Sequence, residues 1–127
     1  MKLTRDAASN DNMVTSYDAT HVSINRQRHE GNLVVTPETV VDSWAARGFD
    51  GLAEADMQTL VDLAPALVII GTGARQRFPH PSLLRPLIEA QIGFEVMDTG
   101  SACRTYNILA SEGRKVAAAL ILDTPAN

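Results

Sequence analysis

Three apolar segments, separated by stretches with helical periodicity, constrain the fold of this chain more than any other feature. Residues 66–71, 94–97 and 116–122 are almost wholly apolar and end at turn residues, which is typical of strands buried on both faces of a sheet. The resulting αβαβαβ order predicts a largely parallel sheet with right-handed crossovers.

The periodic stretches predict three helices, at about 55–63, 82–92 and 101–112. Each has recognisable end signals, because hydroxyl side chains cap helix starts and glycine or proline stops helices. The expected N-caps are Ser82 for the second helix and Thr99 or Ser101 for the third, and the expected stops are Pro65, Gly93 and Gly113.

The N-terminal half is predicted to be mostly β. Val22–Asn25 and Leu33–Thr36 are β-prone and flank polar residues that include Gly31 and Asn32, which indicates a hairpin with a long turn. Thr39–Trp44 is a third β-prone run. We therefore expect a single α/β domain with a central, mostly parallel sheet, helices, and an additional antiparallel β hairpin layer from the N-terminal half.

Length and composition fit one folded domain. The chain has 127 residues, 45% apolar and 20% charged, which is the balance of a globular protein of ordinary domain size. We expect a flexible lead at residues 1–14, the domain at residues 15–122 and a flexible tail at residues 123–127.

Charge and cysteine content narrow the class of protein. With 11 Lys and Arg against 15 Asp and Glu and no basic cluster, nucleic acid is not an expected partner. The acidic residues concentrate in residues 1–63, which offers a surface for a basic partner. Cys103 is the only cysteine, and no apolar run suits a secretory signal or a membrane span, so we expect a cytoplasmic protein without a transmembrane segment.

The stretch ALVIIGTGARQR, residues 66–77, raises the question of a phosphate or nucleotide site. A dinucleotide fingerprint requires a third glycine where Gln76 stands, and FPHP delays the next helix, so the match is incomplete. The glycines equally fit a tight turn that packs closely beside the sheet.

A small anion pocket is the third interpretation of this turn. Ligands in open α/β sheets collect at the carboxyl ends of strands, and the turns 71–73 and 98–100 meet there if their strands are parallel neighbours. Nearby arginines, including Arg77, and the N-terminus of the third helix favour a carboxylate or phosphate. The predicted ligand-binding residues are Gly71, Thr72, Gly73, Arg75, Thr99 and Arg104.

Catalytic and metal sites have weaker support. Cys103 in the first turn of a helix and beside Arg104 could have a lowered pKa and act as a nucleophile, but no base stands at recognisable spacing and a lone cysteine commonly packs as a small hydrophobe. The three histidines form no metal-ligand pattern. We therefore expect no catalytic residue, no metal and no cofactor.

The segment MDTGSACRTYNILASEGRKVAAALIL, residues 97–122, resembles the C-terminal signature of a small α/β family of unknown function. That family includes mitochondrial respiratory complex I (NADH dehydrogenase) assembly factor 3 and an adipogenesis-associated protein with a Mth938 domain. The GTG turn and the segment ending in Trp44 also fit it. The signature residues are Ala102, Thr105, Tyr106, Asn107, Glu112, Gly113 and Arg114.

The resemblance implies a single compact domain, no established catalytic residue and no established cofactor. It also implies a binding or assembly role, with a respiratory-complex subunit or another assembly factor as partner. The alternative from the residues is a small-molecule binding protein or enzyme with a pocket at the 71–73 and 99–100 turns. The signature itself fits either a site or a demanding helix-to-strand corner, and the sequence leaves the oligomeric state open.

Overall fold

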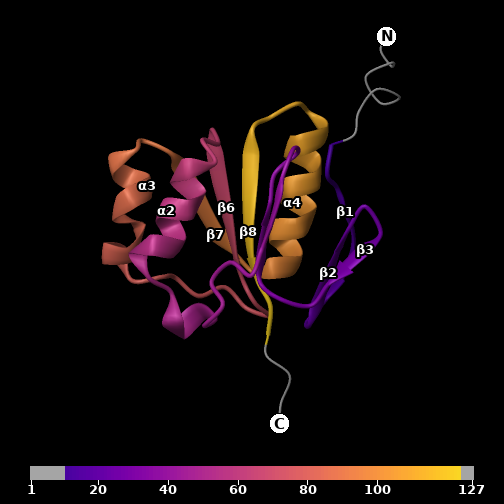
Figure 1. Ribbon diagram of the computed structural model, residues 1–127, viewed down its shortest axis with the longest axis horizontal. Coiled ribbons are helices and arrows are strands. Elements are labelled where there is room, and N and C mark those ends of the chain that lie inside the picture. The colour runs from indigo at the N-terminus through magenta and orange to yellow at the C-terminus, as the bar shows by residue number, and fades with distance from the viewer. Residues whose placement is uncertain (1–10, 124–127) are drawn as a thin grey trace.

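A computed structural model describes residues 11–123, which form two sheets and three α-helices (Figure 1). The main sheet has the strand order β5-β4-β8-β6-β7, and the smaller one has the order β1-β2-β3. Helices α2 and α3 cover one face of the main sheet, while α4 and the small sheet cover the other. The fold is thus a single α/β domain with a mixed main sheet.

The three predicted parallel strands are confirmed. They are β6 (Leu67–Thr72), β7 (Gly93–Met97) and β8 (Val116–Ile121), with β6 pairing in parallel with both of the others. All six residues of β8 are buried, as its apolar sequence predicts for a central strand. Its alternation sends Ala118 and Leu120 to the α4 side and Ala117 and Ala119 to the α2 side.

The predicted hairpin between Val22–Asn25 and Leu33–Thr36 is wrong. The first run lies mainly in β2 (His21–Ile24), which pairs with β1 (Val14–Asp18) and β3 (Gln27–His29). The chain reverses instead at Asn25 and Arg26, whose φ angles of 52° and 72° suit a two-residue hairpin turn. The decisive turn therefore lies earlier than Gly31.

The second run becomes β4 (Leu33–Val35) and joins the main sheet between β8 and β5 (Val40–Asp42), antiparallel to both. All three β4 residues are buried, so other elements pack on both faces of this strand. Pairing within the small sheet alone would leave one face of the strand exposed. The third β-prone run is confirmed as β5. Beyond it, Trp44 leaves the sheet and its indole N–H donates to Asp56 O of the neighbouring helix at 2.8 Å.

The helix predictions hold with changes at the ends. Helix α2 (Glu54–Asp62) follows a short 3₁₀ turn, η1 (Phe49–Gly51), and matches its prediction, whereas the second helix is split into a 3₁₀ turn, η2 (Pro81–Leu84), and α3 (Arg85–Glu89). The chain leaves that helix through Gln91, which takes a left-handed φ of 59°, so the expected stop at Gly93 is wrong. His80, instead of Ser82, caps its start by accepting from Ser82 N.

Helix α4 (Thr99–Ser111) begins two residues before its predicted start. Its N-cap is Asp98, whose carboxylate accepts from Ser101 N at 2.8 Å, so neither Thr99 nor Ser101 has the expected capping role. Its predicted stop is confirmed, because Gly113 has a left-handed φ of 81°. The helix packs on β6 and β8 and also contacts β1.

Most of the expected lead and tail lies outside the described residues. The part of the lead that is described packs on the domain: Asn12 N donates to Pro37 O at 2.9 Å and Val14 is buried in the core. At the other end, Asp123 N donates to Ala19 O at 2.9 Å. Residues at both ends of the described chain thus contact the domain, and the bounds 1–14, 15–122 and 123–127 stay a prediction.

Candidate functional site

The turns after β6 and β7 meet, as expected for parallel neighbours. Gly71, at the beginning of the first turn, packs closely against the start of α4. A Cβ atom at this position would lie 2.9 Å from Thr99 Cα and 3.0 Å from Ala102 Cβ. Glycine is therefore required by the close approach of helix and strand. This contact supports the tight-packing interpretation of the first glycine.

Two threonines connect the turns through hydrogen bonds. Thr99 N donates to Gly73 O at 2.9 Å, and Gly73 N donates back to Thr99 Oγ1 at 2.8 Å. The Thr99 hydroxyl in turn donates to Ile121 O of β8 at 2.6 Å, so one buried side chain joins three strand ends. Thr72 Oγ1 donates to Arg75 O at 2.8 Å and accepts from Arg77 N at 2.9 Å.

These bonds decide which backbone donors remain for a ligand. The Gly73 amide is already paired with Thr99, and Ala74 N donates to Asp123 Oδ1 at 3.3 Å. The Ser101 amide at the start of α4 is paired with the Asp98 carboxylate. Most of the amides that the sequence offered to an anion are thus internally satisfied.

A pocket of about 240 Å³ nevertheless opens where the turns meet. Among the predicted residues, Gly73 and Thr99 line it, and Gly100 of the second turn does too. Gly71 and Thr72 are buried beneath it, and Arg75 is exposed outside its lining. The remaining lining residues are Tyr17, Asp18, Ala19, Ala74, Asp98, Ile121 and Leu122.

The arginines and carboxylates around this pocket have specific partners. Arg104 lies outside the lining, and its guanidinium donates to the hydroxyl of Tyr17, which lines the pocket, and to Ser101 Oγ. Arg77 turns away, donating to Thr72 O and lying 4.3 Å from the centre of the Phe49 ring. Hydrogen bonds from Ser101, first from its backbone N–H, lower the pKa of Asp98. That carboxylate therefore stays ionised at neutral pH.

The anion site stays a prediction, and the charges of the residues that line the pocket affect its affinity for an anion. Asp18 and Asp98 line the pocket, whereas Arg104 lies outside the lining and is engaged with Tyr17. Like charges reduce the affinity for an anion. Sequence reasoning missed Tyr17 and Asp18 because no local pattern shows that the β1–β2 hairpin lies against the start of α4.

Cys103 is buried in the core, and burial raises its pKa to about 12. The charge of Arg104 lowers this pKa, but the loss of hydration outweighs it, and the nearby charge of Asp98 raises the pKa further. The nucleophile interpretation of Cys103 is therefore wrong, because a thiol with so high a pKa is not ionised at neutral pH.

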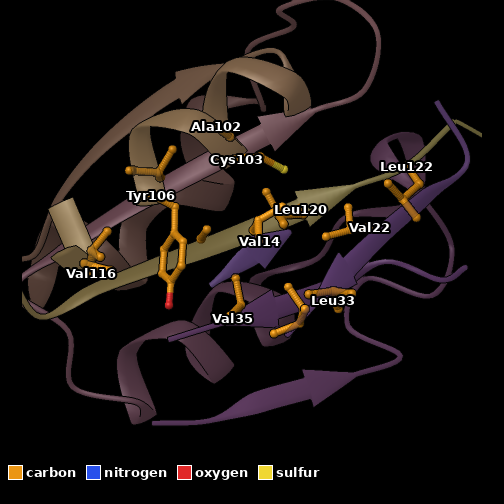
Figure 2. Close-up of a cluster of buried hydrophobic side chains, with 14 residues drawn as sticks. Val14, Val22, Leu33, Val35, Ala102, Cys103, Tyr106, Val116, Leu120 and Leu122 are labelled. Atoms are coloured by element: carbon orange, nitrogen blue, oxygen red, sulfur yellow. The ribbon is translucent and has the colours of Figure 1, made fainter. Parts of the chain in front are cut away.

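The signature residues of α4 mainly attach the small sheet. Asn107 Nδ2 donates to Val14 O at 2.8 Å, while Asn107 Oδ1 accepts from Val14 N at 2.9 Å. Tyr106 points from α4 into the cluster of Figure 2, and its hydroxyl donates to Asn12 O at 2.7 Å. Ala102 packs in the same cluster, and Thr105 Oγ1 lies 3.6 Å from Met97 Sδ.

Beyond the end of α4, Glu112 and Arg114 flank Gly113 and are exposed. Among residues 11–123, these two side chains form no ion pair within 4.0 Å. Gly113 and Arg114 instead line a hollow of about 380 Å³ beside the end of α2. Another hollow, of about 400 Å³, is lined by Trp44 and neighbouring residues, and none of the predicted site residues lines it.

The described residues also bear on metal and membrane chemistry. Between residues 11 and 123, His, Cys, Asp and Glu nowhere gather in a group of three or more that could hold a metal ion. Over the same residues, every helix is too short or too polar to cross a bilayer.

Comparison with known proteins identifies the family to which this chain belongs. A family described as "Protein of unknown function (DUF498/DUF598)" matches residues 14–121. The chain belongs to this family. Among curated relatives, NADH dehydrogenase [ubiquinone] 1 alpha subcomplex assembly factor 3 of Mus musculus is 34% identical over 110 residues, which are 85% of this chain and 59% of that protein. The chain thus spans little more than half the length of this relative.

Solved structures agree with the family assignment. A crystal structure of a Bordetella parapertussis protein has a TM-score of 0.84 and 38% identity, covering 91% of this chain and 99% of its own. A Bordetella pertussis protein, described as a Mth938-like domain, has a TM-score of 0.78 and 31% identity, covering 91% of this chain and 88% of its own. The resemblance to the family with complex I assembly factor 3 and Mth938 domains is confirmed.

Proposed function

We propose that this protein is a non-catalytic binding or assembly protein whose partner is a subunit or assembly factor of respiratory complex I. One observation carries the proposal: 34% identity with an assembly factor of that complex over 85% of this chain. Identity at this level across a whole domain preserves the fold, while a partner surface needs only a few side chains. The cytoplasmic location expected from the sequence belongs to the same proposal.

The acidic bias of the N-terminal half gives this proposal a surface. Glu54 and Asp62 lie eight residues apart on α2 with Gln58 between them, so all three fall on one exposed side of the helix. Asp50 in the preceding 3₁₀ turn is also exposed. A basic partner surface fits these charges, which speed the encounter more than they strengthen the complex.

The test is affinity purification of the full chain from its source cell at low and at moderate ionic strength. We expect complex I subunits or assembly factors, identified by mass spectrometry, and weaker recovery at the higher salt concentration. The triple variant Asp50→Asn, Glu54→Gln, Asp62→Asn should recover less. Glu89→Gln with Glu112→Gln serves as the control, because both residues are exposed and lie outside the N-terminal half.

Two results would contradict the assignment. Absence of complex I proteins at both salt concentrations would remove the proposed partner. Equal recovery by the triple variant and the control would remove α2 as the contact surface while leaving the partner in place. Thermal unfolding of each variant must stay near that of the unchanged protein, since Glu54 lies in the first turn of α2 and favours the helix electrostatically.

A second candidate function is small-molecule binding, and the pocket of about 240 Å³ between the two turns favours it. Its ligand is a small polar or anionic group that contacts Gly73, Thr99 and Gly100 in the lining, with Arg104 drawn in from its contact with Tyr17. Titration with phosphate, acetate and a nucleotide, followed through backbone amide shifts, tests this function. Unchanged shifts at residues 71–77 and 99–105 with all three probes would exclude an anion there.

A further inference from the structure

The outer face of the small sheet carries a polar cluster that the proposed function does not use. Val22 and Ile24 of β2 point into the core, so the alternate residues of that strand face the other way. The β1–β2 register pairs Asp18 with His21 and Ser16 with Ser23, and β2–β3 pairs Ser23 with Arg28. Cross-strand partners share a face. The cluster on this outer face consists of Ser16, Asp18, His21, Ser23 and Arg28.

Three of these side chains form a hydroxyl–imidazole–carboxylate series. Ser16 Oγ lies 3.2 Å from His21 Nε2, within hydrogen-bond reach. On the other side of the ring, His21 Nδ1 lies 2.8 Å from Asp18 Oδ1. This second contact is short but lacks the angles of a hydrogen bond, so Nδ1 is a buried polar atom held by electrostatic attraction alone.

The exposures of these groups differ in a way that suits reaction with a molecule from solution. His21 is only 8% exposed, whereas Ser16 is exposed on the strand at the edge of the small sheet. Figure 1 shows β1, β2 and β3 beside α4 at the side of the domain away from α2. A substrate can therefore approach the hydroxyl while the imidazole stays fixed among its neighbours.

The charges facing His21 come from two strands. Asp18 belongs to β1, and its contacts, first the hydrogen bond from the backbone N–H of Thr20 and then the adjacent His21 ring, lower its pKa to about 2. Arg28 of β3 forms an ion pair with Glu30, with its Nε 2.8 Å from Glu30 Oε2. Glu30 follows the end of β3 and is engaged with Arg28. An imidazolium at His21 thus faces the Asp18 carboxylate.

We propose that Ser16 is a nucleophile that accepts an acyl group from a small ester, with His21 as its general base and Asp18 as the charge that stabilises the imidazolium. The Ser16 hydroxyl proton passes to His21 Nε2 as the oxygen forms a bond to the ester carbonyl carbon. The ester C–O bond then breaks, and the departing alkoxide takes the proton from Nε2. Water releases the acyl group as a carboxylic acid, again with His21 as base.

Arg28 completes the chemical environment. It lies in the same cross-strand row as Ser16, with Ser23 between them, and its side chain is half exposed. Its positive charge on this face favours the negative charge that develops on the carbonyl oxygen during acyl transfer. This activity does not depend on the assembly role, because the α2 surface belongs to the opposite face of the main sheet.

The test combines a fluorophosphonate probe with p-nitrophenyl acetate as the ester. In the full chain we expect one adduct, mapped to Ser16 by peptide mass spectrometry, and a burst of p-nitrophenol. Ser16→Ala should abolish both, and His21→Gln should slow both at least about 100-fold, since general bases typically contribute that much. The control is Ser111→Ala, which removes an exposed hydroxyl at the end of α4, outside the cluster, and should leave both rates unchanged.

A measurement without substitutions guards against a folding defect in the His21 variant. The labelling rate of the unchanged protein should rise with pH and then level off, because only a neutral imidazole accepts the Ser16 proton. Absence of an adduct at Ser16, a rate that increases without a plateau, or equal rates in folded Ser16→Ala protein would each overturn the proposal.

Discussion

The C-terminal half and the small N-terminal sheet are held together by different forces. In β6 and β8 all residues but Leu67 are buried, whereas β1 has one buried residue, Val14, and β3 has none. The small sheet instead depends on β2 and on polar side chains of α4, chiefly Asn107 and Tyr106. Apolar burial therefore fixes one region, and directed hydrogen bonds position the other against it.

This contrast gives the family signature a structural meaning. Asn107 satisfies both backbone groups of Val14, and Tyr106 reaches Asn12 beyond the start of β1. A helix of the parallel unit thus carries the attachment points for a sheet about 90 residues earlier in the chain, at sequence separations of 93 and 94. Four experiments separate the two regions, from the largest expected effect to the smallest.

The largest effect concerns Cys103, which reports how completely the C-terminal half excludes water. Burial raises its pKa from 9.0 to about 12, and only the thiolate reacts. At pH 8 we expect iodoacetamide to modify the native protein about 1000-fold more slowly than the urea-unfolded chain. Similar rates in the two states, measured by mass spectrometry, would show that α4 opens readily.

Gly71→Ala should destabilise the parallel unit by about 3 kcal/mol, because the new methyl group would overlap the backbone of Thr99. The free energy of unfolding in urea measures it. Gly93→Ala is the matched control in the neighbouring strand, where a Cβ would meet only Leu67 Cδ1 at an ordinary 3.7 Å. A similar loss in both variants would mean that strand propensity, and not the helix contact, requires Gly71.

Asn107→Ala should cost about 2 kcal/mol, because it leaves the N–H and C=O of Val14 without their side-chain partners. Hydrogen exchange should accelerate in β1 and β2 while β6 and β8 keep their protection. The neighbouring Ile108→Ala is the control, since Ile108 is 59% exposed. Uniform acceleration across both sheets would refute separate stabilisation of the two regions.

The smallest effect concerns acid stability. The pKa values of Asp18 in the hairpin and Asp98 at the start of α4 are both lowered by hydrogen bonds, first from the backbone N–H of Thr20 and of Ser101 respectively. A lowered folded pKa stabilises the fold above the unfolded value of about 3.9, and this contribution is lost as pH falls through the folded value, about 2 for Asp18.

Asp18→Asn and Asp98→Asn should each flatten the loss of stability in this acid range and leave the slope above pH 5 unchanged. Urea unfolding between about pH 2 and pH 5 is the measurement. If hydrogen exchange shows that Asp98→Asn affects β1 to β3 as much as α4, the two regions share one acid-sensitive unit and the comparison fails.

The candidate pocket was predictable in position but not in composition. The two turns follow β6 and β7, and parallel strands bring their carboxyl ends together, so Gly73 and Thr99 were within reach of sequence reasoning. Tyr17 and Asp18 were not, since their approach depends on how a distant sheet packs on α4. The Ser16–His21–Asp18 series was missed as well, because its spacing has meaning only across a hairpin whose register is known.

The N-terminal β-prone runs show the limit of what local sequence patterns can predict. Their strand character was evident, but a strand can pair with any compatible edge, and the choice depends on which pairing buries it on the correct faces. Leu33–Val35 joined β8 instead of the preceding run because all three of its side chains require cover.

The sequence by itself determined the parallel αβαβαβ unit, because helical and strand periodicities are local and each connection is short. The sequence also shows glycine at position 71, but the close contact with Thr99 that requires this glycine is visible only in the structure. Only the tertiary structure decided the partners of β2 and β4, the burial of Cys103 and the charges around the pocket. These depend on contacts between segments far apart in the chain, where hydration, sterics and hydrogen bonds are set by what packs opposite and not by neighbouring residues.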